Sequence, residues 1–202
     1  MSRRDADAET VLAAGRRGER RWGGPISGER QRTDVSIRPE SPRDHAAVRA
    51  VHTAAFGHAA EADLVDALRD SPAWVPELSL VAESDDGIVG HVLLTRVVIA
   101  AGAGLALAPL GVLPHRQRRG VGSALVRAVL EAAATAGEPL VVVLGDPAYY
   151  GRFGFFPASR YGVTCAYDVS DEVFQALPLP TYRGAPRGLV RYAEPFSALD
   201  ER

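Results

Sequence analysis

A buried strand that runs into a glycine-rich turn and then into a helix is the feature that most constrains this chain. Residues 106–113 form a nearly unbroken apolar run, which is typical of a buried strand. Pro109 interrupts the run, and because proline cannot donate to a ladder, it predicts a strand that splits or bulges at this point. From Val121 apolar residues recur at helical spacing, so we expect a helix from near Gly120 to Gly137, where glycine suits a C-terminal cap.

The start of that helix is a candidate phosphate site. A helix N-terminus offers unpaired backbone N–H groups and a partial positive charge. Gly120 and Gly122 lack the side chains that would keep a ligand away from these groups. Gln117, Arg118 and Arg119 precede the turn and add hydrogen-bond donors and positive charge. The turn therefore predicts a site for a pyrophosphate.

Several classes of pyrophosphate site do not fit the sequence. The 202-residue chain contains no lysine, which excludes a Walker A loop and a pyridoxal phosphate enzyme, because both need one. A dinucleotide fingerprint needs a third glycine where Leu125 stands, and an acid at the end of a second strand. Asp146 is near that spacing but precedes Pro147. The pattern therefore disfavours a dinucleotide.

Two motifs resemble a known family. The segment 117–122, QRRGVG, is similar to the coenzyme A signature of the GNAT superfamily of N-acetyltransferases, which reads Gln or Arg, two residues, Gly, one residue, then Gly or Ala. Residues 112–114, VLP, stand where that family ends its splayed strand in Val-x-Pro.

The second motif lies downstream, after an expected strand at 140–144. There Tyr150, Gly154 and Phe155 match the family's Tyr-x-x-x-Gly-Phe pattern. The whole segment GDPAYYGRFGF resembles the YhbS-like branch of these acetyltransferases most, and the resemblance covers residue 36 to the end.

The resemblance implies an α/β fold with a central, mostly antiparallel sheet, a splayed strand pair and flanking helices. It also implies acetyl-CoA as a cosubstrate and no metal. Because Pro109 would force the ladder apart, backbone groups near Leu110 and Val112 are expected to pair with the pantetheine arm and to face the thioester oxygen. The residues expected to hold coenzyme A are Leu110, Val112, Gln117, Arg118, Arg119, Gly120, Val121, Gly122 and Ser123.

The folded part, residues 35–202, is expected to contain a strand, two helices, three antiparallel strands, a helix, a strand, a helix and final strands. The expected bounds are a strand at 35–38, helices from 41 to 57 and at 60–68, strands at 78–83 and 88–99, and a glycine-rich loop at 102–104 before the splayed strand. The turn at Asp85-Asp86-Gly87 is a hairpin signal.

Residues 1–34 differ from the remainder of the chain. They mix arginines with acids and show little apolar periodicity, which predicts a flexible N-terminal tail. A start codon placed too far upstream explains this segment equally well. A basic arm that binds an acidic partner is disfavoured, because the charges are mixed.

Composition excludes several partners. The net charge of −2 argues against a nucleic-acid footprint or a polybasic membrane anchor, and no apolar run is long enough to span a bilayer. A single cysteine, Cys165, cannot form an internal disulfide, so a reducing cytoplasm is the expected setting. The use of arginine alone as the basic residue and the many alanines indicate a GC-rich bacterial genome. A homodimer is left open.

Tyr150 is the candidate general acid, with Tyr149 as the alternative. A phenol has an ordinary pKa of about 10, near that of a thiol, so it suits protonation of the departing sulfur. The alternative is that these tyrosines only pack their rings and satisfy their hydroxyls.

Glu83 and Asp146 are the candidate general bases. Each has a structural alternative, since Asp146 before Pro147 suits a helix N-cap and Glu83 lies beside a hairpin turn. The five histidines show no metal-ligand spacing, although His52 and His91 are candidates for lining the acceptor pocket.

Two functions follow from these residues and from the resemblance. The first is an N-acetyltransferase that moves the acetyl group of acetyl-CoA to a primary amine of a small molecule or peptide by direct attack. The alternative is a non-catalytic acyl-CoA-binding sensor or regulatory module on the same fold.

Overall fold

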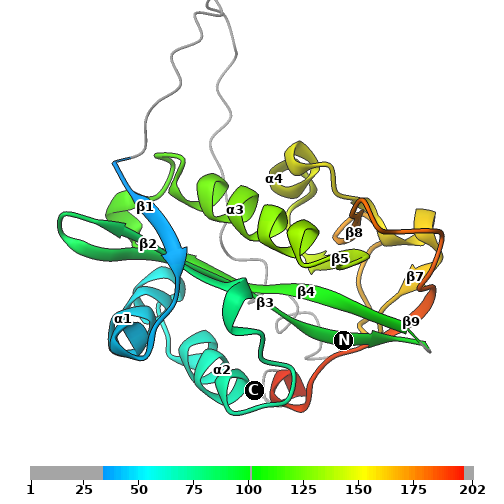
Figure 1. Cartoon of the computed structure of the whole chain (residues 1–202), viewed down its shortest axis with the longest axis horizontal. Coiled ribbons are helices and arrows are strands. Elements are labelled where there is room, and N and C mark those ends of the chain that lie inside the picture. The colour runs from blue at the N-terminus through cyan, green and yellow to red at the C-terminus, as the bar shows by residue number, and fades with distance from the viewer. Residues whose placement is uncertain (1–33, 101, 198–202) are drawn as a thin grey trace, which may run out of the picture.

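The protein folds around a twisted mixed sheet with helices on both faces (Figure 1). The computed structural model describes residues 34–100 and 102–197, so the predicted flexible tail lies outside the described residues apart from Asp34. The strand order is β1-β2-β3-β4-β5-β8-β6, in which β4 and β5 run parallel and the other neighbours run antiparallel. The predicted α/β fold with a mostly antiparallel sheet is confirmed.

The strands are β1 Ser36–Pro39, β2 Ser79–Ser84, β3 Gly87–Ile99, β4 Gly102–Val112, β5 Leu140–Leu144, β6 Phe156–Pro157, β7 Val163–Thr164, β8 Phe174–Pro178 and β9 Gly188–Arg191. The α-helices are α1 His45–Phe56, α2 Ala60–Arg69, α3 Val121–Thr135 and α4 Pro147–Tyr150. Short 3-10 turns connect several of them, at Pro42–Asp44, Pro76–Leu78, Pro114–Arg116, Gly151–Phe153, Ala158–Tyr161 and Glu194–Phe196. None of the helices within 34–100 and 102–197 is long and apolar enough to cross a membrane.

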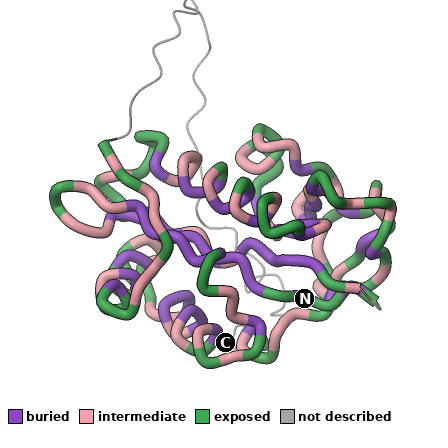
Figure 2. The backbone as a smooth tube through the Cα atoms, viewed as in Figure 1, coloured by how far each residue is buried: buried purple, intermediate pink, exposed green. Residues whose placement is uncertain are grey.

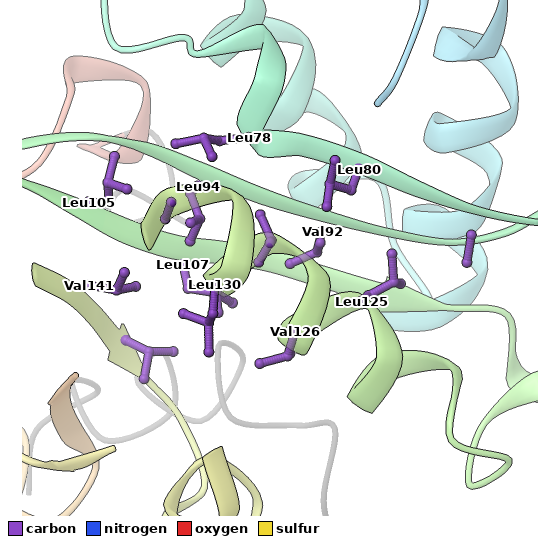
Figure 3. Packing of buried hydrophobic residues seen from close by; sticks show 14 of the residues in the cluster. Leu78, Leu80, Val92, Leu94, Leu105, Leu107, Leu125, Val126, Leu130 and Val141 are labelled. Atoms are coloured by element: carbon purple, nitrogen blue, oxygen red, sulfur yellow. The ribbon is translucent and has the colours of Figure 1, made fainter. Parts of the chain in front are cut away.

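Helix α3 covers one face of the sheet, and α1 and α2 cover the other (Figure 1). Leu125, Val126 and Leu130 of α3 pack with Val92 and Leu107 of the central strands (Figure 3). Figure 2 shows that these strands are buried along much of their length, as expected for a sheet covered on both faces. Each fully buried leucine or valine contributes about 1.5–3 kcal/mol relative to its exposed state.

The helices end where the sequence indicates. Helix α1 stops at Gly57, which adopts a left-handed conformation with φ +82° and donates its N–H to Thr53 O at 2.9 Å. Helix α3 is followed by Gly137, which also has a positive φ of +79°. Both glycines confirm the predicted helix ends, because residues with a Cβ rarely adopt this backbone conformation.

Strand β4 bulges at Pro109, as predicted. Val92 of β3 is paired with Leu110, whereas Leu94 is paired with Leu107, so two residues of β4, one of them Pro109, oppose a single residue of β3. An extra residue on one strand bends that strand and disrupts the ladder locally, and the pairing with β3 resumes at Leu110. The bulge lies at the point where β4 leaves its other neighbour.

On its other side β4 pairs with β5 over a short stretch. The register joins Leu105 to Val141 and Ala106 to Val142, and among the described residues the pairing goes no further. Beyond Ala106 the two parallel strands diverge, which confirms the splayed pair.

The predicted loop at 102–104 is wrong, because these glycines belong to β4. Gly102 pairs with Ile99, and Gly104 pairs with Val97. A Cβ on Gly104 would lie 2.9 Å from Cδ1 of Ile99, so glycine allows β4 to approach that side chain closely. The glycines that suggested a loop therefore serve close packing inside the strand.

A buried polar network joins α1 to β3 and to the segment after β1. Nε2 of His52 lies 2.8 Å from Nδ1 of His91, and Nε2 of His91 lies 2.9 Å from Oγ of Ser79 and 3.3 Å from Oε2 of Glu40. Ser79 donates to the same carboxylate, and Nη2 of Arg69 donates to its other oxygen at 2.5 Å. The network therefore connects α1 and α2 to β2, to β3 and to the segment after β1.

The partners assign the protons of the two imidazoles. A carboxylate at Glu40 accepts from Nε2 of His91, so Nδ1 of a neutral His91 accepts from Nε2 of His52. Nδ1 of His52 is then unprotonated, in agreement with its being buried without a hydrogen-bond partner among residues 34–100 and 102–197. Both histidines are fully buried and neutral in this arrangement.

Burial lowers the pKa of both histidines below the ordinary value of about 6.5; at His91 the neighbouring Glu40 opposes this shift, but burial prevails. Burial alone would raise the pKa of Glu40, but the interactions with His91, Ser79 and Arg69 outweigh it and lower this pKa to about 2. All three shifts make the folded state less stable in acid than at neutral pH.

Acidification is expected to destabilise the protein. Below about pH 6.5 the unfolded chain binds protons at His52 and His91 that the folded chain does not, so the free energy of unfolding falls by up to about 1.4 kcal/mol per pH unit for each histidine. Glu40 adds to this loss below about pH 4.5. Urea unfolding at a series of pH values measures it. His91→Gln should flatten the slope, exposed His115→Gln should not, and a slope that His91→Gln leaves unchanged would contradict the assignment.

Candidate functional site

A cavity of about 870 Å³ opens where β4 and β5 diverge. Its floor comes from residues 106–110 of β4 and from residues 142–146 at the end of β5. One end is bounded by the turn before α3 and by α4, and the other by α1, α2 and residues near the end of the described chain. The splayed strand pair therefore leads from the predicted pyrophosphate turn to a second, chemically different end.

The open edge of β4 exposes backbone groups to this cavity. The N–H of Leu113 donates to Val89 O at 3.0 Å, so these two residues face each other as a hydrogen-bonded pair. Because hydrogen-bonded and non-hydrogen-bonded pairs alternate along an antiparallel ladder, Val112 and Leu110 turn their N–H and C=O groups away from β3. Both residues line the cavity, as expected for groups that pair with an extended ligand.

The turn before α3 has the backbone conformation of an anion cradle. Arg118 has φ +58° and Gly120 has φ +87°. The first helical hydrogen bond runs from the N–H of Ala124 to Gly120 O at 2.9 Å, so the N–H groups of residues 121–123 precede it and are free for a ligand. Successive N–H groups at a helix N-terminus form a concave anion site.

Most of the predicted coenzyme residues lie together. The ones that line the cavity are Leu110, Val112, Gln117, Arg118, Gly120, Gly122 and Ser123. Val121 turns its side chain into the core, and only its backbone belongs to the turn. Arg119 is exposed beside the turn and does not line the cavity.

Gln117 holds the turn in place. Its Nε2 donates to Val112 O at 3.0 Å, so the side chain ties the turn to the end of β4. The carbonyl oxygen of Val112 therefore already accepts one hydrogen bond. Leu110 turns both its N–H and its C=O toward the cavity.

The two tyrosines of α4 face different parts of the cavity. The hydroxyl of Tyr149 lies over the start of α3, 2.8 Å from where a Cβ on Gly122 would be. The guanidinium of Arg152 stacks over the Tyr149 ring at 4.1 Å. Burial raises the pKa of Tyr149, and a hydrogen bond with Ser123 opposes this shift. Tyr149 therefore belongs to the cradle end.

Tyr150 packs its ring against Gly145, where a Cβ would lie 2.3 Å from Cε2 of the ring. Gly145 follows β5, so the close contact fixes the tyrosine beside the diverging strand. Burial raises the pKa of Tyr150, and the neighbouring Tyr149 adds to the shift, so the phenol stays protonated at neutral pH.

The two predicted bases lie in different places. Asp146 lines the cavity and caps α4, because its Oδ1 accepts from the N–H of Ala148 at 2.8 Å. Glu83 lies on β2 and accepts from Nε of Arg38 at 2.7 Å, which lowers its pKa. The structure does not bring Glu83 to Tyr150 or to the cavity, because β2 pairs with β1 and β3 and Arg38 of β1 holds the carboxylate there.

Glu61 of α2 is a buried acid of the cavity that sequence reasoning missed. Its place in the first turn of a helix is an ordinary position for an acid, so the sequence alone carries no signal for it. His52 and His91, which were expected to line the acceptor pocket, lie instead in the buried network with Glu40. The two imidazoles hydrogen-bond to each other, and both are fully buried between α1 and the sheet.

Several known proteins have sequences similar to that of this chain. A sequence model of the acetyltransferase (GNAT) domain matches residues 76–157. The uncharacterized N-acetyltransferase YjhQ of Escherichia coli is 36% identical over 160 residues, which cover 75% of this chain and 88% of YjhQ. The uncharacterized N-acetyltransferase YhbS of the same organism is 33% identical over 165 residues, which cover 80% of this chain and 98% of YhbS.

Solved structures agree with the sequences. The crystal structure of Escherichia coli YhbS in complex with CoA matches with a TM-score of 0.73 and 30% identity, covering 88% of this chain and 96% of YhbS. A GNAT family acetyltransferase from Brucella melitensis in complex with acetyl-CoA matches with a TM-score of 0.67 and 36% identity, covering 80% and 97% of the two chains.

Replacing Gly120 by valine is expected to abolish coenzyme A binding. The new side chain would enter the cradle, and a β-branched residue would strain the left-handed backbone. Gly137→Val is a matched control, since Gly137 has a similar φ of +79° at the other end of α3 and does not line the cavity. Calorimetry should detect binding by the control and none by Gly120→Val. Equal affinity of the two variants would contradict the cradle.

Proposed function

The chain belongs to the GNAT family of N-acetyltransferases, and from this membership we propose that it transfers the acetyl group of acetyl-CoA to a primary amine of a small molecule or peptide by direct attack. The observation that carries this proposal is the continuity of the cavity. The anion cradle, the open edge of β4 and Tyr150 line one space. A module that only binds an anion would need the anion cradle but neither the open edge of β4 nor Tyr150.

The cradle fits the pyrophosphate of acetyl-CoA. The N–H groups of residues 121–123 suit phosphate oxygens, and Arg118 adds positive charge at the cavity wall. A side chain on Gly122 would fill the gap to the Tyr149 hydroxyl, so glycine keeps that space open. The CoA and acetyl-CoA complexes of the two structural relatives support this assignment.

The open groups of Leu110 suit the acyl end of the donor. An extended pantetheine arm can pair with a free strand edge as an added strand does. A backbone N–H in this segment is positioned by the sheet before any ligand arrives, and such fixed donors stabilise an oxyanion without reorganisation. Because the donor is backbone, exchange of Leu110 for another apolar residue should have little effect.

The reaction proceeds by addition and elimination. The amine nitrogen forms a bond to the thioester carbonyl carbon, the carbon–sulfur bond breaks, and the departing thiolate takes a proton from the Tyr150 hydroxyl. The tyrosine then recovers a proton released by the amine nitrogen. Burial raises its pKa, which keeps the phenol protonated at neutral pH but makes it a weaker acid than an ordinary phenol. Asp146 acts as a positioning residue, since its cap fixes α4 and hence both tyrosines.

The proposal is tested by calorimetry with acetyl-CoA, followed by thiol release across a panel of primary amines. Binding with turnover on at least one amine is the expected result. Binding without turnover on any amine would replace the enzyme by an acyl-CoA sensor. The absence of binding would overturn the assignment of the cradle.

Tyr150→Phe is expected to lower kcat by about 100-fold while leaving the Kd for acetyl-CoA unchanged, because the ring still packs on Gly145 and only the proton donor is lost. Tyr149→Phe is the matched comparison. Its hydroxyl lies at the cradle, so its loss should raise the KM for acetyl-CoA rather than lower kcat. Stopped-flow thiol release gives both constants. Wild-type turnover by Tyr150→Phe would place the acid elsewhere.

A further inference from the structure

The end of the cavity opposite the cradle is formed by three separate segments. Phe56 ends α1, Glu61 and Leu64 lie on α2, and Tyr192 and Phe196 lie near the end of the described chain. The two arginines of the cavity wall, Arg118 and Arg152, belong to the cradle and to the turn after α4. The far end is therefore largely apolar and aromatic, and Glu61 is a buried acidic group in it.

Glu61 is buried, with 5% of its surface exposed. Two other acids line the cavity, but Asp146 caps α4 and Asp168 is exposed. A buried carboxylate is retained in a protein where it is paired with a donor or serves a ligand, because desolvation of an ion is costly.

The partners of Glu61 are incomplete. Its Oε2 is buried and accepts no well-aligned hydrogen bond within the described part of the chain, although Nδ1 of His58 lies 3.1 Å away. Burial raises the pKa of Glu61, and its own backbone N–H and His58 oppose the shift. Arg49, the cation of α1 on this side, is held by Asp63 and Asp66 at 2.6 Å each. A ligand that brings N–H donors and a positive charge would complete the site.

We propose that Glu61 binds the acceptor as an ammonium ion and that the acceptor is a primary amine on a compact apolar or aromatic group. The inference rests on the proposed function and names its substrate class. Phe56, Tyr192 and Phe196 line this end of the cavity, and aromatic side chains suit both an apolar substituent and a cation. The far end has no cation for an acceptor carboxylate among the residues that line it, so a free amino acid is disfavoured.

The site is joined to the reacting centre by β4. Ala108 packs in the cluster that contains Leu64 and Phe196, whereas Leu110 packs in the cluster that contains Tyr150. An amine bound at Glu61 thus lies at the same strand segment as the proposed oxyanion donor. The carboxylate takes one proton from the ammonium and later releases it to water, which leaves the nitrogen lone pair free to attack.

The test compares wild type, Glu61→Gln and Glu61→Asp with exposed Glu131→Gln on α3 as the control. The probes are 2-phenylethylamine, its neutral analogue 2-phenylethanol, and phenylalanine, which adds a carboxylate. Calorimetry in the presence of CoA measures binding, and thiol release measures KM and kcat. Thermal unfolding without ligand is recorded for every variant.

We expect wild type to bind 2-phenylethylamine at least about tenfold more tightly than either analogue, since only the amine fills a buried ion pair. Glu61→Gln should lose this preference and retain its Kd for acetyl-CoA, and Glu61→Asp should be intermediate. Because the glutamine removes a costly buried charge, its melting temperature should be equal to or above that of wild type. A merely structural glutamate would instead give a lower melting temperature and an unchanged preference.

The outcomes separate this inference from the proposed function. Amine binding that depends on Glu61 without turnover would support the site and overturn the enzyme. Turnover with an unchanged KM for 2-phenylethylamine in Glu61→Gln would overturn the site and leave the enzyme standing. Tighter binding of phenylalanine than of 2-phenylethylamine would overturn the substrate class.

Discussion

The divergence of β4 from β5 is the constraint on which the remainder of the structure depends. Strand β4 must pair with β3 on one side to complete the sheet, yet leave its other side open over the cavity. An open edge in the middle of a sheet leaves polar groups without partners. The bulge at Pro109 shifts the register with β3 by one residue, and proline brings no N–H to the open side, close to where the pairing with β5 stops.

The cavity created by this divergence is electrically asymmetric. Its cradle end combines helix N–H groups with Arg118, whereas its far end combines aromatic rings with Glu61. An anionic donor and a cationic acceptor would each find one favourable end and one unfavourable end. In the proposed reaction, complementary charges at the two ends would orient the two substrates in opposite directions and bring them together at β4.

The sequence predicts the parts of this site whose signal is local. A left-handed glycine at 120, a helix start at 121 and a proline in a strand each impose their geometry on neighbouring residues, so the cradle and the splay could be recognised. The general base could not be predicted in this way, because proximity to the cavity is a property of the assembled sheet. Glu83 lies at the end of a strand, but its neighbour Arg38 is known only once β1 pairs with β2.

Two buried carboxylates on the same side of the sheet show how such residues can be told apart once the fold is known. Glu40 and Glu61 have side chains that are 2% and 6% exposed, respectively. Ser79, His91 and Arg69 surround Glu40 and lower its pKa, whereas burial dominates at Glu61 and raises its pKa. The first carboxylate is stabilised by the protein itself and holds α1 and α2 to the sheet. The second stays incomplete beside a cavity, and this difference is why we propose Glu61 rather than Glu40 as the group that binds a cation.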